Sequence, residues 1–383
     1  MKIGVDIRVL MDEYYSGISE YTANLLSALL SSGKEHEYKL FYNSWKNLEN
    51  RLRPWSGDRA QVLGTHYPNK IFNYFLQKIF KYPKLDQALG GVDIFWSPHL
   101  NFSSFSKKAK KIITVHDLSF LRYPDFFSGR KNFWHSALAV KKLLGRYDHV
   151  VAVSENTKND LIELVGLSPE KISVIYSGNN LIRREVSDVE ANEFFKARGI
   201  SGRYFLFLGN IEPRKNIGRL ITAYNEFRSR HPEYGDLKLI LAGAPGWKNK
   251  QIYEEAIQSP FKTDIIFLGY ISQKEKEILY SRATIFTYPS LYEGFGFPPL
   301  EAMTYGVPVV CSNVSSLPEV VGDAALTINP YKPEEITQAW EIILGSAKIK
   351  SDLIAKGLKR AELFSWSKAA PEYLKLFSDL TSK

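Results

Sequence analysis

Cysteine is almost missing from this chain, which has one thiol, Cys311, among its 383 residues. A single thiol forms neither an intramolecular disulfide nor a thiolate metal cluster, and this fits a reducing compartment. Long apolar runs are missing too, because the stretch around residues 112–115 falls far short of the roughly 18 residues that a membrane-spanning helix needs. Residues 1–7 carry Asp6 within an apolar run and no small-residue cleavage site follows, so no signal peptide is indicated. We therefore predict a cytoplasmic protein.

The composition is that of a folded chain of enzyme size. Hydrophobic side chains make up 44% of the residues and charged side chains 24%, which excludes a disordered, collagenous or coiled-coil protein. A length of 383 residues is enough for two domains of ordinary size.

The formal charge of +9 is unevenly distributed along the chain. Residues 1–185 hold 26 Lys and Arg against 18 Asp and Glu, whereas the remainder holds 24 against 23. Such a field favours an anionic partner: nucleic acid, an acidic membrane leaflet or a phosphorylated substrate. Nucleic acid is disfavoured, because the basic residues are dispersed and no recognition motif is present.

Short apolar runs rich in Val, Ile, Phe and Tyr alternate with longer amphipathic stretches, which is typical of βαβ units and a parallel sheet. In the first half we expect strands near residues 2–10, 38–42, 92–96, 111–116, 149–153 and 172–176. In the second half we expect them near residues 204–208, 237–242, 265–268, 284–288, 308–311 and 325–328. The sequence therefore predicts an α/β protein with two similar series of strands.

Residues 177–202 are polar and charged, and we interpret them as a linker between two doubly wound domains. Ligands bind such sheets where strand carboxyl ends and helix amino ends converge, so we expect a site that draws on both halves. Residues 366–380 have helical periodicity and are expected to pack back on either domain.

The most informative stretch is residues 289–303. A glycine-containing loop follows a predicted strand, Pro298 and Pro299 suit the opening of a helix, and Glu301 is expected in its first turn. The helix amino end offers free N–H groups to a phosphate, while Glu293 and Glu301 can accept hydrogen bonds from sugar hydroxyls. The alternative, weighed equally, is that Glu301 only complements the helix dipole and Glu293 is a solvated loop charge.

A second stretch places the adjacent cations Arg214 and Lys215 after the strand predicted at residues 204–208. Two cations at the carboxyl end of a strand can neutralise a diphosphate and stabilise it as a leaving group. The alternative is an ordinary solvated basic turn.

Two weaker signals lie in the first half. His116 and Asp117 follow a predicted strand, so the imidazole can reach a ligand while Asp117 orients it or an incoming hydroxyl. The alternative is a histidine satisfied by the local backbone. Gly17 lies in the first predicted strand-to-helix turn, where backbone can approach a phosphate, but the Gly-x-Gly-x-x-Gly signature is absent.

Together these motifs resemble the GT-B retaining glycosyltransferases of family four, the group-one transferases, over essentially the whole chain. The resemblance rests on Glu293-Gly294-Phe295-Gly296, Glu301-Ala302-Met303, residues 212–216, Val115-His116-Asp117 and Val153-Ser154-Glu155. Residues 116–120 with Tyr123-Pro124 are similar to bacterial mannosyltransferases that build O-antigen and capsular chains.

The resemblance implies a GT-B fold, in which two Rossmann-like doubly wound domains face each other across a cleft. An acceptor-side domain would comprise residues 1–182 with the C-terminal helix at about 366–383, and a domain that binds the nucleotide sugar would comprise residues 183–365. Ser16-Gly17 stands where the family usually has two glycines.

The resemblance also assigns roles within a site for a nucleotide sugar. It places Glu301 on the nucleotide ribose, Glu293 on the donor sugar, Arg214 and Lys215 on the diphosphate, and His116 near the reacting centre. Further substrate-binding positions would be Gly17, Asp117, Gly294, Phe295, Gly296 and, near the base, Tyr270.

The implied reaction is a retaining hexosyl transfer without a metal or other cofactor, which agrees with the lack of Asp-x-Asp in the sequence. The resemblance favours front-face attack by the acceptor hydroxyl, with no general base assigned. We expect GDP-mannose as donor and a glycan or lipid-linked glycan as acceptor. A UDP-sugar donor and a sugar-nucleotide 2-epimerase of the same fold are the alternatives.

Residues 67–85 form a basic amphipathic stretch in the half that carries the charge surplus. Such a helix suits an anionic membrane surface, here the inner face of the plasma membrane, which would make the protein peripheral. The alternative, weighed equally, is a helix that packs in the core and has a solvated basic edge.

Overall fold

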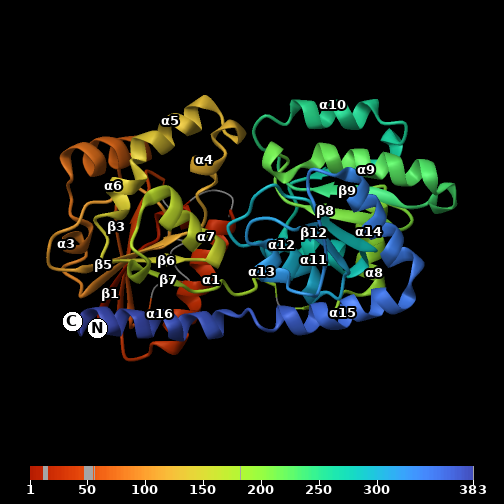
Figure 1. Cartoon of the computed structure of the whole chain (residues 1–383). Helices are drawn as coiled ribbons and strands as arrows, with labels where there is room; N and C mark the ends of the chain where they lie inside the picture. The colour runs from red at the N-terminus through yellow and green to blue at the C-terminus, as the bar shows by residue number, and fades with distance from the viewer. Residues whose placement is uncertain (12–15, 47–54, 56, 182, 383) are drawn as a thin grey trace. The chain divides into compact units, whose positions relative to one another are not determined.

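The computed structural model describes residues 1–383 except residues 12–15, 47–54, 56, 182 and 383 (Figure 1). The chain divides into two compact units. The N-terminal unit comprises Met1–Arg122, Gly129–Asn180 and Phe364–Lys383, and the C-terminal unit comprises Tyr123–Ser128 and Leu181–Leu363. In each unit of Figure 1 the strands lie at the centre and helices lie around them. Within the described residues, no helix is both long and apolar enough to cross a bilayer.

The described part of the N-terminal unit holds a parallel sheet of order β3-β2-β1-β4-β5-β6-β7. Its strands are β1 (Lys2–Asp6), β2 (Glu37–Asn43), β3 (Ala60–Thr65), β4 (Ile94–Ser97), β5 (Lys110–Val115), β6 (His149–Ala152) and β7 (Ile172–Val174). Its helices include α1 (Gly17–Ser32), η3 (Ile71–Phe80, a π-helix), α3 (Leu85–Ala88), α4 (Ser119–Arg122), α5 (Gly129–Leu138), α6 (Val140–Leu144), α7 (Glu155–Asp160) and α16 (Trp366–Thr381).

The described part of the C-terminal unit holds a second parallel sheet, of order β10-β9-β8-β11-β12-β13. Its strands are β8 (Tyr204–Leu208), β9 (Lys238–Ala242), β10 (Ile265–Gly269), β11 (Ile285–Tyr288), β12 (Val309–Ser312) and β13 (Leu326–Ile328). Its helices include α8 (Asp188–Ala197), α9 (Ile217–Arg230), α10 (Lys250–Gln258), α11 (Gln273–Arg282), α12 (Phe297–Thr304), α13 (Leu317–Val321), α14 (Pro333–Gly345) and α15 (Ala347–Ala361).

Both sheets have the strand order of doubly wound folds, which confirms the predicted fold class. The order reverses between β1 and β4 in the first sheet and between β8 and β11 in the second. Helices cover both faces of such a sheet, so its central strands are buried throughout, as β4 and β11 are. Loops that leave neighbouring strands diverge at a reversal, and the resulting crevice is where ligands bind.

The C-terminal helix α16 packs on α1 within the N-terminal unit. The hydroxyls of Tyr21 on α1 and Tyr373 on α16 lie 2.6 Å apart, and the Tyr373 hydroxyl lies 2.8 Å from Thr114 Oγ1 on β5. Burial of all three side chains makes these hydrogen bonds costly to lose. The helix predicted from the periodicity of residues 366–380 is thereby confirmed.

Two predicted elements differ from the structure, and one strand of the structure was not predicted. Strand β1 ends at Asp6 rather than near residue 10, because Asp6 accepts hydrogen bonds from Arg8 and the chain turns into a 3-10 helix. The predicted linker at residues 177–202 contains α8, whose amino end is capped by Ser187. The edge strand β3 was not predicted, since only Ala60 in it is buried and the apolar pattern is weak.

Candidate active site

The cationic couple predicted from the sequence lies at the carboxyl end of β8. Arg214 and Lys215 belong to a 3-10 turn, Pro213–Lys215, that follows this strand. Lys215 is 6% exposed, and its ammonium donates to Glu293 Oε1 at 2.6 Å and to the Tyr288 hydroxyl. Burial lowers the pKa of Lys215, and the neighbouring charge of Arg214 acts in the same direction. The interpretation of this couple as a solvated turn is therefore wrong.

Glu293 lies on the loop that follows β11, the strand next to β8 in the sheet. Its Oε1 accepts from Lys215 and from the Ser290 hydroxyl at 2.5 Å, and its Oε2 accepts from Arg214 Nη1 at 3.0 Å. Burial alone would raise the pKa of Glu293, but the charges of Arg214 and Lys215 outweigh it and lower the pKa to about 2. Glu293 is thus a buried, ionised carboxylate and not a solvated loop charge.

Arg214 is held in place from two sides. Its guanidinium pairs with Glu212 Oε1 at 3.0 Å, and its Nη1 donates to the backbone oxygen of Tyr292 at 2.8 Å as well as to Glu293. Glu212 is 1% exposed, and its Oε2 has no partner among the described residues. We did not predict a role for Glu212, although it stands within the quoted motif at residues 212–216.

The glycine-containing loop predicted before the helix is present, and one of its glycines has a positive φ. Gly296 caps α12 with φ +114, and a Cβ there would lie 2.7 Å from Leu317 Cδ2. The Ser316 hydroxyl donates to the backbone oxygens of Glu293 and Phe295, at 3.0 and 2.7 Å. Gly294 stands between these two anchored residues. The Ser316 hydroxyl therefore holds the backbone of the loop on both sides of Gly294.

Glu301 was predicted to lie in the first turn of its helix. This prediction is wrong, because α12 already begins at Phe297. It is 2% exposed, and its two oxygens accept from Lys276 Nζ and the Tyr280 hydroxyl on α11, each at 3.0 Å. A role limited to the helix dipole does not fit this geometry. The partners Lys276 and Tyr280 were not predicted, since no motif connects them with residues 289–303.

His116 follows β5 in the N-terminal unit. Its Nε2 lies 2.8 Å from the backbone oxygen of Pro98, and burial lowers the pKa of the imidazole to about 4. Because a carbonyl only accepts, Nε2 carries the proton and Nδ1 is left as an acceptor. Asp117 was predicted to orient this ring or an incoming hydroxyl, but it forms no hydrogen bond to the ring. It accepts instead from the backbone N and hydroxyl of Ser119, at 3.0 and 2.6 Å.

Gly17 and Tyr270 were also predicted to bind substrate. Gly17 begins α1 behind its cap Ser16, and the space around a Cβ at this position is open. Tyr270 is 55% exposed and follows β10, two strands from β8 in the order of the second sheet. The structure thus joins Arg214, Lys215 and Glu293 by direct contacts, whereas Tyr270 follows another strand of the same sheet.

Chemically, the network combines two cations and two carboxylates at the reversal between β8 and β11. Glu212 and Glu293 neutralise the two cations within the fold. An incoming diphosphate would therefore share Arg214 and Lys215 with these two carboxylates. Buried cations act more strongly on developing negative charge than solvated ones do. The arrangement is suited to bind and stabilise a phosphorylated leaving group.

The comparisons with known proteins agree on one family. Residues 190–360 match the family model of glycosyl transferases group 1, and residues 15–183 match that of glycosyltransferase family 4. O-antigen chain mannosyltransferase B of Escherichia coli is 32% identical over 381 residues, covering 94% of this chain and 96% of that protein. O-antigen chain mannosyltransferase RfbU of Salmonella typhimurium (strain LT2) is 29% identical, covering 64% of this chain and 62% of that protein.

Among solved structures, sucrose-phosphate synthase of Thermosynechococcus elongatus matches with a TM-score of 0.75 at 20% identity, over 100% of this chain and 99% of that chain. This likeness concerns the fold alone. The fold is that of the GT-B glycosyltransferases, with two Rossmann-like parallel sheets. Within that class, the chain belongs to the group 1 glycosyltransferases of family 4 and is a glycosyltransferase.

Proposed function

We propose that the enzyme transfers mannose from GDP-mannose to a hydroxyl of a growing O-antigen polysaccharide of lipopolysaccharide, with retention at the anomeric carbon. The names of the two mannosyltransferase relatives support the sugar and the acceptor class. The buried network of Arg214, Lys215 and Glu293 supports a diphosphate donor, and it is the observation on which the proposal rests.

In this proposal Arg214 and Lys215 hold the diphosphate of the donor. When the bond between the sugar and the phosphate oxygen breaks, the leaving diphosphate gains negative charge that these cations stabilise. The acceptor oxygen forms its bond to the same carbon from the same face and passes its proton to the departing phosphate. The cationic couple supplies the charge stabilisation, so the proposed reaction uses no metal or other cofactor.

The two glutamates would bind the polyol parts of the donor. Glu293 is ionised in the fold, and it would accept hydrogen bonds from hydroxyls of the sugar. Glu301 would accept from the ribose once its present partners, Lys276 and Tyr280, rearrange or share it. Gly294, Phe295 and Gly296 would shape the backbone against the donor, and Tyr270 would lie near the base.

On the acceptor side, His116 would contact the donor sugar as a neutral imidazole. A pKa of about 4 leaves it uncharged at pH 7, and its Nδ1 would then accept a hydrogen bond from a hydroxyl. Gly17 and Asp117 would border the same substrates from the N-terminal unit.

We also propose a peripheral position at the inner face of the plasma membrane. For residues 67–85 the sequence left two alternatives, a helix at a membrane surface and a helix packed in the core. Helix η3 has features of both, because Phe72 packs in the core with Phe41 and Phe95 while other apolar side chains are exposed. The exposed ones include Ile71 (46%), Phe75 (50%), Ile79 (52%) and Phe80 (69%). Apolar side chains on a basic element suit the boundary of an anionic bilayer.

Product analysis with labelled donors tests the proposal. Incubation with GDP-mannose and a soluble O-antigen oligosaccharide should extend the oligosaccharide by one mannose, and NMR should show retained configuration. Transfer from UDP-sugars alone would refute the donor while keeping the transferase. A new nucleotide sugar formed without acceptor would instead show the 2-epimerase, because epimerisation consumes no acceptor.

A further inference from the structure

His116, which the proposed function places beside the donor sugar, stands next to a buried hydroxyl cluster in the N-terminal unit. The cluster joins Tyr21 of α1, Thr114 of β5 and Tyr373 of α16 by their hydroxyl groups. The ring of Tyr21 also contacts the imidazole of His116 directly. The C-terminal helix is therefore only two contacts away from a side chain that the proposed reaction uses.

One hydrogen bond alone does not fix the imidazole of His116. Its Nε2 donates to the backbone oxygen of Pro98 at 2.8 Å, but the ring can still swing about the line from Cβ to that nitrogen. Such a swing would move Nδ1, the acceptor that the proposed reaction uses. A group that contacts a substrate has to keep its direction, because small misplacements lower the rate steeply.

The ring of Tyr21 supplies the missing restraint. Its centroid lies 4.6 Å from that of His116, and the two ring planes stand at 88° to each other. Aromatic pairs favour this edge-to-face arrangement, and a ring packed at a right angle blocks rotation of its neighbour. His116 is only partly buried, as a ring that contacts a substrate has to be, whereas Tyr21 is buried. Tyr21 thus restrains the imidazole from inside the unit.

Helix α16, which packs along α1 (Figure 1), holds the Tyr21 ring at two points. The Tyr373 hydroxyl lies 2.6 Å from the Tyr21 hydroxyl, at the tip of the ring. The indole of Trp366, at the start of α16, meets the same ring edge-on, with 5.2 Å between centroids and 77° between planes. A hydrogen bond at the tip and an aromatic contact at the side together fix the direction in which the Tyr21 ring points.

The Tyr373 hydroxyl is itself anchored to the sheet. It lies 2.8 Å from Thr114 Oγ1, which accepts from the indole N–H of Trp96 on β4 at 3.0 Å. The Tyr373 ring also packs against that indole, with centroids 5.5 Å apart. Phenylalanine and valine would fill the same space without the cost of burying polar groups. A chain of directional bonds in such a place specifies one arrangement of the side chains.

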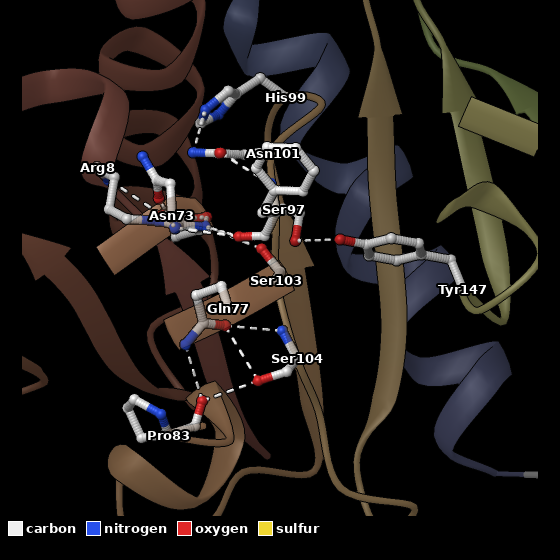
Figure 2. Close-up of polar contacts among 12 residues, drawn as sticks. Arg8, Asn73, Gln77, Pro83, Ser97, His99, Asn101, Ser103, Ser104 and Tyr147 are labelled. Carbon is white, nitrogen blue, oxygen red and sulfur yellow. Dashed lines mark hydrogen bonds and ion pairs between the residues drawn. The ribbon is translucent and has the colours of Figure 1, made fainter. Parts of the chain in front are cut away.

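Figure 2 shows that the segment after β4 is tied down on both sides of Pro98. Before it, the Ser97 hydroxyl accepts from Tyr147 at 3.1 Å. After it, the Ser103 hydroxyl accepts from Arg8 at 2.8 Å. The Pro98 oxygen is therefore a fixed acceptor for the imidazole. Any change in the orientation of the imidazole then depends on its second contact, the ring on α1.

The two helices are also held together without the hydroxyl cluster. Asn180 Nδ2 donates to Glu20 Oε2 on α1 at 3.1 Å. The backbone N of Asn179 donates to the backbone oxygen of Phe364, just before α16, at 3.1 Å. These bonds keep the start of α16 beside α1. Removal of the Tyr373 hydroxyl alone should therefore leave α16 in place.

We infer that Tyr373 is a positioning residue for the transfer reaction and orients the His116 imidazole through the ring of Tyr21. The inference rests on the proposed function, in which His116 contacts the donor sugar. Tyr373 contacts no substrate in this arrangement. Its loss should therefore act on the rate of transfer through the imidazole, and lower kcat more than it raises KM for the donor.

Steady-state transfer kinetics of Tyr373→Phe test the inference. The substitution removes one hydroxyl and keeps the ring between Trp96 and Phe377. We expect kcat to fall about tenfold and KM for GDP-mannose to change less than about twofold, because the imidazole is misplaced and the diphosphate site is intact. Tyr21→Phe breaks the same hydrogen bond from the side of α1 and should give the same loss.

A double-mutant cycle distinguishes positioning from general stabilisation of the unit. In the His116→Ala background, Tyr373→Phe should no longer lower kcat, because the imidazole that it orients is absent. A loss of about tenfold that persists in this background would overturn the inference. Wild-type kcat in both Tyr373→Phe and Tyr21→Phe would overturn it as well.

Tyr38→Phe is the matched control. Tyr38 is another buried tyrosine of this unit, and its hydroxyl donates to the backbone oxygen of Leu29 near the other end of α1, at 2.9 Å. Tyr38→Phe and Tyr373→Phe should both melt below the wild type, since each loses a buried hydrogen bond. Only Tyr373→Phe should lower kcat. An equal loss of kcat in Tyr38→Phe would show that any weakening of α1 suffices, and would refute the positioning role.

Histidine NMR gives a readout that does not depend on activity. In protein labelled at histidine nitrogen, the imidazole resonances of His116 are identified by their loss in His116→Ala. They should shift in Tyr373→Phe and stay in place in Tyr38→Phe, and unshifted resonances in Tyr373→Phe would overturn the inference. Wild-type kcat in His116→Ala would instead refute the role that the proposed function gives to His116, so the two failures are distinguishable.

Discussion

Lys215 and Glu293 form a buried ion pair, with 2.6 Å between Nζ and Oε1. The pair joins the loop after β8 to the loop after β11 at the point where the strand order of the second sheet reverses. Arg214 and Glu212 complete the network around it. Binding and folding therefore depend on the same charges, and substitutions here should alter both.

Replacing Glu293 by glutamine should impair both stability and transfer. Glutamine keeps the shape but leaves Arg214 and Lys215 with one carboxylate, and breaking a buried pair costs about 3 kcal/mol of unfolding free energy. Loss of the contact to the donor sugar should lower kcat/KM about 100-fold. Urea denaturation and transfer kinetics measure the two effects. Glu193→Gln, on the exposed side of α8, should change neither, and wild-type kinetics of Glu293→Gln would remove Glu293 from the site.

Acid should destabilise the wild type through the same carboxylate. The pKa of Glu293 is about 2 in the fold, against an ordinary value of 4.5, so its contribution to stability is complete above pH 4.5 and is lost as the pH falls towards 2. The difference corresponds to about 3 kcal/mol. Unfolding free energies of wild type and Glu293→Gln, measured from pH 6 downwards, should therefore converge. A constant gap down to about pH 3 would contradict the depressed pKa.

Gly296→Ala should destabilise the loop that carries Glu293. Its φ of +114 is unfavourable for alanine, and the added Cβ would lie 2.7 Å from Leu317 Cδ2. The expected cost is about 2 kcal/mol in unfolding free energy, with a lower affinity for the donor. Gly345→Ala is the control, since Gly345 lies in α14 with open space around it and no positive φ. Equal melting temperatures of the two variants would refute the strain at Gly296.

Most of the fold was predictable, because buried parallel strands give continuous apolar runs whose order along the chain is visible in the sequence. Strand β3 was not predictable. It is an edge strand in which Gln61 is exposed and the neighbouring residues are only weakly apolar, so it gives no continuous apolar run. The conformation of residues 71–80 as a π-helix was not predicted either, because its apolar periodicity is shared with an α-helix.

The site was predictable where its residues directly follow strands. Arg214, Lys215 and Glu293 lie on the loops that follow β8 and β11, and the order of predicted strands placed them there. Lys276 and Tyr280 reach Glu301 from α11, and such contacts depend on helix packing that the sequence does not display.

Arg214→Lys should weaken binding of the nucleoside diphosphate while the charge is kept. The guanidinium contacts Glu212, the Tyr292 backbone oxygen and Glu293 at once, and an ammonium cannot reproduce this planar set of donors. We expect the Kd for GDP, measured by calorimetry, to rise about tenfold. Arg230→Lys, at an exposed position of α9, is the control and should leave the Kd unchanged. An unchanged Kd in Arg214→Lys would show that the diphosphate binds elsewhere.

The protonation state of His116 tests the role of this histidine without any substitution in the C-terminal unit. Burial lowers the pKa of this imidazole to about 4, so it stays neutral across the pH range in which an ordinary histidine titrates. The wild-type profile of kcat/KM should therefore show no inflection from His116 between about pH 5.5 and 8. His116→Ala should lower kcat/KM about 100-fold at every pH in this range, since it removes the acceptor Nδ1. A rate deficit that appears only below about pH 6.5 would instead require a protonated imidazole and contradict the neutral ring.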